Sequence, residues 1–132
     1  MLESNNQNFN HLKIHTQYSI CEGAIKIDNL KDFCKENKIP CLGLSDTSNL
    51  CGALEFAENI SKVGTQPIIG TQIFFRFEDT TGLLPLIALN EKGYKKIIEL
   101  SSRSYLENDA LSDPHLDIKE LLIDTEGVSL LS

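Results

Sequence analysis

Short apolar runs recur along this chain with the period or the length of β-strands. Residues 11–16 set Leu12 and Ile14 between polar neighbours, which is the two-residue period of a strand with one buried face. Further runs, bounded by proline, glycine or polar turn residues, predict strands at residues 41–44, 67–77, 83–89 and 128–131. Pro85 lies inside one of these runs and favours an edge position, because proline has no N–H to donate to a neighbouring strand.

Apolar residues at three- and four-residue spacing predict helices between these strands. We expect the first helix to have Asp28 as its N-cap, to run to about Asn37 and to be stopped by Pro40. The polar segment 45–49 (SDTSN) precedes a second helix, and a capping role for it is favoured over a catalytic one. That second helix is expected to end near Gly64 and carries the stripe Ala53, Phe56, Ala57, Ile60 and Val63.

Two more helices are expected in the second half of the chain. Asn90 is the predicted N-cap of one, and Asp117 with Glu120 resembles a capping box for a short last helix. Strand and helix therefore alternate at spacings that suit βαβ units with right-handed crossovers. We expect an α/β fold with a mainly parallel sheet or barrel and helices outside it.

Functional side chains in such folds gather where strands end. The ends of the first two predicted strands present His15, Thr16, Asp46, Thr47 and Ser48. An H-x-H at the end of a strand would place two imidazoles on one face to share a metal. This chain has Lys13 in place of the first histidine, and its ammonium group repels cations. A lone histidine such as His15 is more often a structural residue than a ligand.

Composition narrows the class of protein. The chain has 132 residues, a single-domain length that is short for a complete β/α barrel of about 200 residues or more. Its net charge of -7 argues against direct binding of a nucleic-acid backbone by this segment. We find no apolar run near the roughly 20 residues of a membrane span and no signal peptide, so we expect a cytoplasmic protein without membrane contact. The four cysteines form no C-x-x-C pair and are expected to be buried free thiols.

Four segments together resemble, in order and spacing, the opening of the alpha subunit of bacterial DNA polymerase III. They are HLKIHTQYSICEGAIKI, IPCLGLSDTSNLCGALEF, QPIIGTQIFF and ALNEKGYKKIIELSSRSY. The resemblance implies that residues 1–132 are the N-terminal part of a PHP (polymerase and histidinol phosphatase) domain, a distorted β/α barrel that is partial here. In that family the polymerase domains, their Mg²⁺ and the DNA-binding parts lie further along the chain.

Active PHP relatives hold a metal cluster for phosphoester hydrolysis, and the resemblance implies that this chain has lost most of the ligands. The remnants are His15, Glu22 and Asp46. The lost positions are Lys13 and Thr47, which replace histidines of the H-x-H and T-D-H motifs, Gln72, which replaces a glutamate, and Leu83, which replaces another histidine. No catalytic residue, metal or cofactor is therefore expected in this segment.

The same resemblance implies a catalytically inactive structural module of a DNA-directed DNA polymerase, a nucleotidyltransferase at full length. Its expected partners are an epsilon-type proofreading exonuclease, the rest of the alpha subunit and the replisome, with DNA bound by other domains. The alternative is an active metal-dependent PHP phosphoesterase or proofreading nuclease, and a freestanding α/β protein of unrelated role is the third hypothesis. Because the domain is partial, we also expect the last strand to expose an edge through which the chain self-associates.

Overall fold

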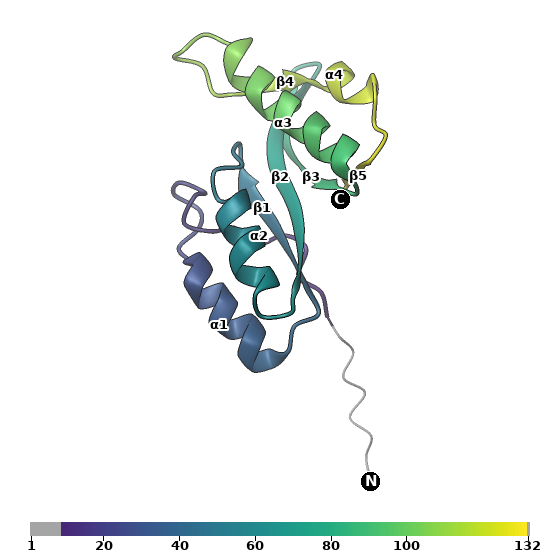
Figure 1. Cartoon of the computed structure of the whole chain (residues 1–132). Helices are drawn as coiled ribbons and strands as arrows, with labels where there is room; N and C mark the ends of the chain where they lie inside the picture. The colour runs from purple at the N-terminus through teal and green to yellow at the C-terminus, as the bar shows by residue number, and fades with distance from the viewer. Residues whose placement is uncertain (1–8, 132) are drawn as a thin grey trace.

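The computed structural model describes residues 9–131 and forms one five-stranded sheet with helices packed against it (Figure 1). The expected α/β class is confirmed. The strands are β1 Cys41–Thr47, β2 Gln66–Phe77, β3 Thr80–Ala88, β4 Leu116–Asp117 and β5 Val128–Leu130. The helices are α1 Ile27–Asn37, α2 Ala53–Ser61, α3 Glu91–Leu106 and α4 Ile118–Leu122. The strand order is β1-β2-β3-β5, and β4 pairs separately with β2.

The sheet is mixed, so the expectation of mainly parallel strands is wrong. Strands β1 and β4 run parallel to β2, whereas β3 is antiparallel to β2 and β5 is antiparallel to β3. The reason lies in the turn between β2 and β3, where Glu78 takes a left-handed φ of 52°. Two residues suffice for a hairpin, but a parallel connection needs a crossover of a dozen or more. Pro85 lies in β3 between β2 and β5, and not in an outer strand.

The first predicted strand is present only as a short parallel pairing with β1. The backbone N–H of Ile14 donates to Gly43 O at 3.0 Å, and the N–H of Ser45 donates to Ile14 O at 2.8 Å. The bridge pairs Ile14 with Leu44. Gly43 is needed here, because a Cβ at this position would lie 2.6 Å from the Cα of Leu12. Segment 11–16 is thereby held against the edge of β1.

Two of the predicted helix caps are wrong. Helix α1 begins at Ile27 with Lys26 as its N-cap, and Asp28 lies inside the first turn. Residues 45–47 are the end of β1 and not a capping loop, and the N-cap of α2 is Gly52. The carboxylate of Asp46 accepts hydrogen bonds from Thr16 and Ser19 instead. Helix α2 ends at Ser61, before Gly64.

The other two predicted caps are confirmed. The side chain of Asn90 accepts a hydrogen bond from Gly93 N at 3.0 Å, and that of Asp117 accepts one from Lys119 N at 3.0 Å. Glu120 does not complete a capping box, because its carboxylate accepts a hydrogen bond from Arg103 Nη2 at 2.7 Å. It ties α4 to α3 instead.

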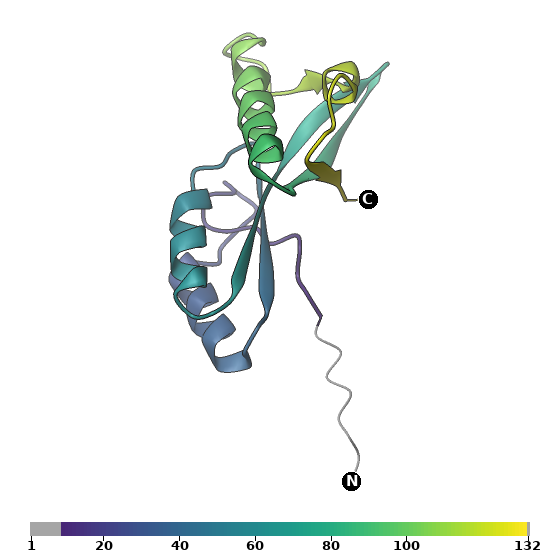
Figure 2. The ribbon, with the colours of Figure 1, turned by 45° about the vertical axis from the view of Figure 1, so that its right-hand side comes forward.

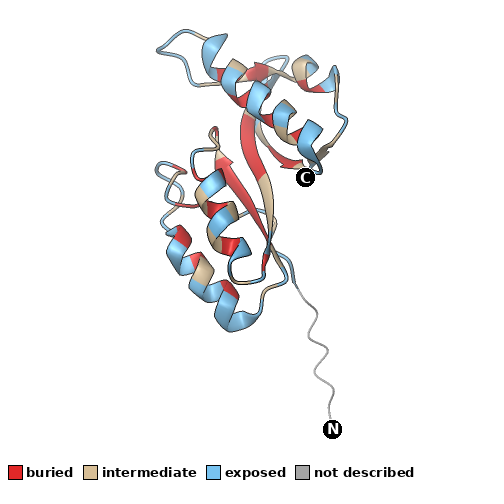
Figure 3. Cartoon of the chain, in the orientation of Figure 1, coloured by how far each residue is buried: buried red, intermediate tan, exposed pale blue. Residues whose placement is uncertain are grey.

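Two apolar clusters form along the long strand β2, and both lie on the helical side of the sheet (Figures 1 and 2). The first joins α1, α2 and β1 through residues such as Leu30, Phe56 and Leu44. The second joins α3, α4, β3 and β4 to the other half of β2. Its buried residues are Ile73, Phe75, Leu86, Ile97, Leu100, Leu116 and Leu121. Figure 3 shows buried positions concentrated along the strands and on the helix faces turned toward them.

The cysteines are all free, as expected, but their predicted burial is only partly right. Cys34 is buried in the first cluster and Cys41 is partly exposed, whereas Cys21 and Cys51 are exposed. Both exposed cysteines lie in loops outside the helices and strands, so their apolar neighbours in sequence do not enclose them. Among the described helices, none combines the length and the hydropathy needed to cross a bilayer.

Candidate functional site

The candidate site lies on the sheet face opposite α1, α2 and α3, called the inner face here. Side chains alternate between the two faces of a strand, and residues paired across strands share a face. Leu44 belongs to the helical core and pairs with Ile14, so Lys13 and His15 project to the inner face. Thr47 and Gln72 are paired there across β1 and β2.

Leu83 completes the set of lost ligand positions on this face. It pairs with Phe74 of β2, which is two residues from Gln72 and therefore on the same side of the sheet. The fold thus brings the four positions predicted to have lost ligands, Lys13, Thr47, Gln72 and Leu83, to one face of the sheet. It does not bring all of them into contact with one another.

Thr47 is hydrogen-bonded to two of the other candidate positions. Its hydroxyl oxygen accepts a hydrogen bond from Gln72 Nε2 at 2.6 Å and donates its own proton to Glu22 Oε2. Glu22 comes from the loop of residues 17–24, whereas Thr47 and Gln72 come from the ends of the β1 and β2 pairing. Because a hydroxyl has a single proton, Thr47 has no further hydrogen to donate. We call this hydrogen-bonded trio the Thr47 clasp.

Asp46 lies on the other face of β1 and is fully buried. Its Oδ1 accepts hydrogen bonds from the backbone N–H of Thr16 at 2.6 Å and from Ser19 Oγ at 2.8 Å. Its Oδ2 accepts a third from Thr16 Oγ1 at 2.7 Å. A buried carboxylate is costly unless it is hydrogen-bonded, and these three donors meet that need. Asp46 therefore fastens the turn of residues 16–19 to β1, and it is not part of the helix cap that was expected.

His15, Lys13 and Leu83 are not joined to the clasp. Lys13 and Leu83 line one hollow of about 490 Å³ together with Leu84, Pro85, Leu130 and Leu131. The ion pairs found within the described residues do not include one between Lys13 and Asp46 or Glu22. The Nδ1 atom of His15 is buried and has no protein partner among the residues that the structure describes.

Several residues that hold this region together were not singled out from the sequence. Ser19 Oγ accepts a hydrogen bond from Thr47 N at 3.0 Å while it donates to Asp46. Asn49 Nδ2 donates to Tyr18 O at 2.8 Å and to Thr47 O at 3.1 Å. The available signal was the density of short polar residues in TQYS and SDTSN, because such side chains often bond to the nearby backbone.

Two tyrosine hydroxyls tie the loops around the end of β1 to the helices. Tyr18 donates a hydrogen bond to Glu55 Oε2 at 2.6 Å, and this bond with the nearby carboxylate charge raises the pKa of Tyr18. Tyr105 donates to Ser48 O at 2.7 Å, and burial raises the pKa of Tyr105. Both tyrosines are therefore neutral donors at neutral pH, and Tyr105 ties α3 to the loop that follows β1.

The PHP domain family model matches residues 11–132, which is nearly the whole chain. This chain belongs to the PHP domain family. Over 141 aligned residues it is 38% identical to the DNA polymerase III subunit alpha of Caulobacter vibrioides, and the match covers 100% of the chain but 12% of that relative. Further bacterial proteins of the same name are 33% to 36% identical. The predicted resemblance to the alpha subunit is confirmed, and the chain spans about an eighth of the length of that relative.

Solved structures support the same fold for this PHP chain. A candidate metal-dependent phosphoesterase from Bifidobacterium adolescentis superposes with a TM-score of 0.55 at 18% identity, over 74% of this chain and 32% of that one. An amidohydrolase from Chromobacterium violaceum, solved with bound sulfate and no metal, superposes with a TM-score of 0.60 at 15% identity, over 74% and 33%. These likenesses establish the α/β barrel-type architecture, of which the PHP chain contains a part.

The donor set of the inner face does not fit a catalytic metal cluster. Such a site needs several imidazole or carboxylate ligands and an open position for an activated water. The ammonium of Lys13 and the side chain of Leu83 cannot serve as ligands. The carboxylate of Glu22 and the amide of Gln72 are both hydrogen-bonded to Thr47. Among the described residues, no three or more His, Cys, Asp or Glu side chains are grouped closely enough to hold a metal ion.

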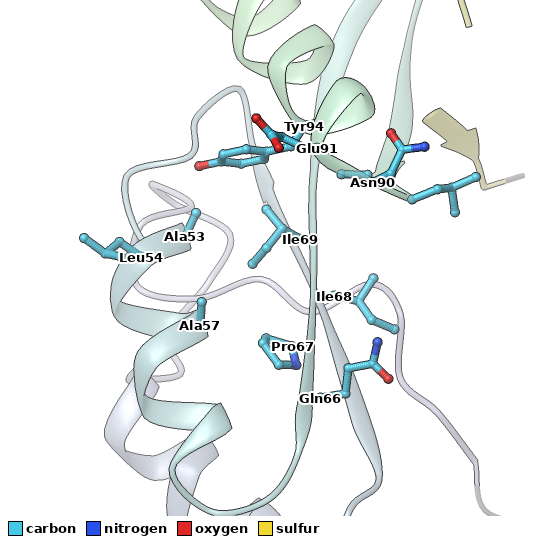
Figure 4. A pocket seen from close by; sticks show the side chains of 12 residues that line it. Ala53, Leu54, Ala57, Gln66, Pro67, Ile68, Ile69, Asn90, Glu91 and Tyr94 are labelled. Atoms are coloured by element: carbon cyan, nitrogen blue, oxygen red, sulfur yellow. The ribbon is translucent and has the colours of Figure 1, made fainter. Parts of the chain in front are cut away.

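A separate apolar groove lies between α2 and the start of α3 (Figure 4). It has a volume of about 440 Å³ and is lined mainly by aliphatic side chains of α2 and the first half of β2. Tyr94 and Glu91 close one end, as Figure 4 shows. This groove is on the helical side of the sheet, so it is not continuous with the inner-face positions.

Proposed function

We propose that this chain is the PHP module of a DNA polymerase III alpha subunit and that the module is catalytically inactive. In the longer protein, DNA-directed nucleotidyl transfer with Mg²⁺ is then carried by residues outside these 132. The relatives of this name support the assignment, since they match the chain over 91% to 100% of its length. The module itself serves as a structural base and as a docking platform.

One observation carries the proposal of inactivity. The Thr47 clasp engages two of the lost ligand positions and one of the remnants, Glu22, in hydrogen bonds to one another. Glu22 already accepts the proton of Thr47, and Gln72 points an N–H into the clasp, while the Oε1 of Gln72 is buried without a partner among the described residues. Lys13 adds a positive charge to the same face. The arrangement favours a packed polar network over an open hydrolytic centre.

The docking proposal concerns an epsilon-type proofreading exonuclease. A polymerase without nuclease ligands in its own PHP module needs a separate source of proofreading. The net charge of -7 suits contact with a protein better than contact with DNA. The rest of the alpha subunit and the replisome are the other proposed partners.

Metal analysis and a phosphodiester substrate test the inactive module. We expect protein purified without chelator to hold no stoichiometric zinc, manganese or iron, and to show no turnover when manganese or zinc is added. The matched control is His15→Ala, which removes a remnant imidazole from the inner face. Stoichiometric metal together with turnover that disappears in His15→Ala would show that the alternative, an active phosphoesterase, is correct.

Binding of the full-length protein to an epsilon-type exonuclease tests the docking role. We expect the full-length protein to retain an immobilised exonuclease, and a version that lacks residues 1–132 and the remainder of its PHP domain to lose it. The polymerase activity of the deleted version is the control for folding. Retention of the exonuclease by the deleted, active polymerase would place the docking site outside the PHP domain.

A further inference from the structure

In the loop of residues 17–24, Tyr18 packs against the first apolar cluster, but the tip of the loop at residues 20–22 has little apolar anchorage. Ile20 is 86% exposed, and Cys21 and Glu22 are exposed as well. Cys21 also takes a left-handed φ of 65°, a conformation that costs energy for a residue other than glycine. Polar contacts therefore hold the tip of this loop in place.

Those polar contacts converge on the end of β1. At its start the loop is held by Asp46 through Ser19, and at its far end by Thr47 through Glu22. Thr47 is bound in turn to Gln72 of β2. The Thr47 hydroxyl is thus the point where three segments meet: the loop, β1 and β2. In a metal-binding PHP site, ligands from separate segments would be joined by the cation.

We propose that the Thr47 clasp takes over the structural task of the missing cation, so that this PHP module is folded and its loop closed without any divalent metal. This goes beyond the proposed docking function and does not depend on exonuclease binding. The bond from Thr47 to the Glu22 carboxylate is charge-assisted, the stronger class of hydrogen bond. Gln72, 3% exposed, donates the other bond through its Nε2, and its Oε1 is buried without a partner among the described residues.

The clasp also opposes metal entry. A cation at this point would have to displace the Thr47 proton from Glu22 and turn the N–H of Gln72 away. Both rearrangements break satisfied hydrogen bonds before any ligand bond forms. In this proposal, hydrogen bonds to the Thr47 hydroxyl join the segments that a metal ion would join in a metal-binding site. We expect the Thr47 clasp and a bound metal ion to exclude each other.

Thermal unfolding of the 132-residue chain tests the clasp. Thr47→Val keeps the shape of the side chain and removes the hydroxyl, and we expect it to lower the unfolding midpoint by about 3 to 6 °C. Thr47→Ser restores a hydroxyl and should recover most of that loss. Thr81→Val, an exposed threonine of β3, is the matched control and should leave the midpoint within about 1 °C.

Glu22→Ala keeps the test decisive if Thr47→Val fails to fold, because Glu22 is exposed and its truncation leaves the core intact. Hydrogen exchange should then accelerate in residues 17–24 and leave α3 unchanged. The unfolding midpoint of the double variant Glu22→Ala, Thr47→Val should fall by less than the sum of the decreases in the two single variants, because the two residues share one hydrogen bond.

Metal addition and chelation provide a second test of the proposal. We expect the midpoint of the unaltered chain to stay within about 1 °C with chelator, with zinc or with manganese, since a ligand that binds only the folded state would raise it. A clear rise with either metal, or a fall with chelator, would overturn the proposal. So would additive losses in the double variant. Neither result bears on exonuclease binding by the full-length protein, which is measured separately.

Discussion

Thr16 and Asp46 are 30 residues apart in sequence and are joined by two hydrogen bonds, one from the backbone N–H and one from the hydroxyl of Thr16. Both residues are fully buried. The pair holds the end of segment 11–16 against the end of β1, and it thereby sets the position of His15 and of the loop that carries Glu22. Asp46, predicted to be a remnant of the family's ligand set, has a structural role in this chain.

Substitution of Asp46 should destabilise the chain strongly. Asp46→Asn removes the charge that strengthens three buried hydrogen bonds, and its NH₂ group either faces a donor or makes the hydroxyl of Thr16 accept where it now donates. We expect a loss of about 2 to 4 kcal/mol in the free energy of unfolding, measured by urea denaturation. The exposed Asp79→Asn is the control. A loss below about 0.5 kcal/mol for Asp46→Asn would show that this network contributes little.

Asp124 should contribute to the stability of the chain against acid. Hydrogen bonding from the backbone N–H of Glu126 lowers the pKa of Asp124 below its ordinary value of 3.8, and Lys92, 3.5 Å away, lowers it further. A carboxyl whose folded pKa is depressed stabilises the fold above the unfolded pKa, and that contribution is lost as the pH falls through the folded value.

Asp124→Asn should therefore be less stable than the unaltered chain at about pH 6, and the difference should vanish at pH values well below 3.8. Urea denaturation at a series of pH values measures it. The difference should be small and reduced by salt, because Lys92 and Asp124 are about half exposed. A difference that persists unchanged into strong acid would mean that the carboxylate charge is not its source.

The chain should self-associate through β5. Within the described residues β5 pairs only with β3, and Leu130 on it is 46% exposed. An unpaired strand edge with an exposed apolar side chain is a template for another chain. Sedimentation velocity should show a concentration-dependent increase in size that Leu130→Lys reduces, since a lysine on an edge strand opposes pairing. A strictly monomeric species at all concentrations would contradict this.

DNA should bind poorly to these 132 residues. With a net charge of -7, the chain lacks the clustered lysine and arginine that neutralise phosphates. We expect fluorescence anisotropy with single- and double-stranded DNA to show no saturation at micromolar protein and physiological salt. The full-length protein is the positive control. Tight binding by the 132-residue chain would require a basic surface that its sequence does not provide.

Much of the fold follows from patterns among residues that are close in sequence. The spacing of apolar residues located α1 and α2, and the proline and polar boundaries located the strands, because burial of one face imposes a period on the sequence. Asn90 and Asp117 were recognised as caps, since each satisfies an N–H of its own helix. Asp28 and segment 45–49 have the same chemistry but do not cap helices. The carboxylate of Asp46 accepts a hydrogen bond from Thr16, which is 30 residues away in sequence, and so it does not cap the helix.

The sequence by itself determined the α/β class and the PHP family, because these depend on periodicity and on ordered motifs. Tertiary structure alone decided the pairing of the strands, which a two-residue hairpin makes mixed. It also decided that Gln72 and Glu22 both bond to Thr47, and that Lys13 forms none of the ion pairs found in residues 9–131. Such contacts join residues 25 apart in sequence, and they are set by strand register and loop path, which no local pattern specifies.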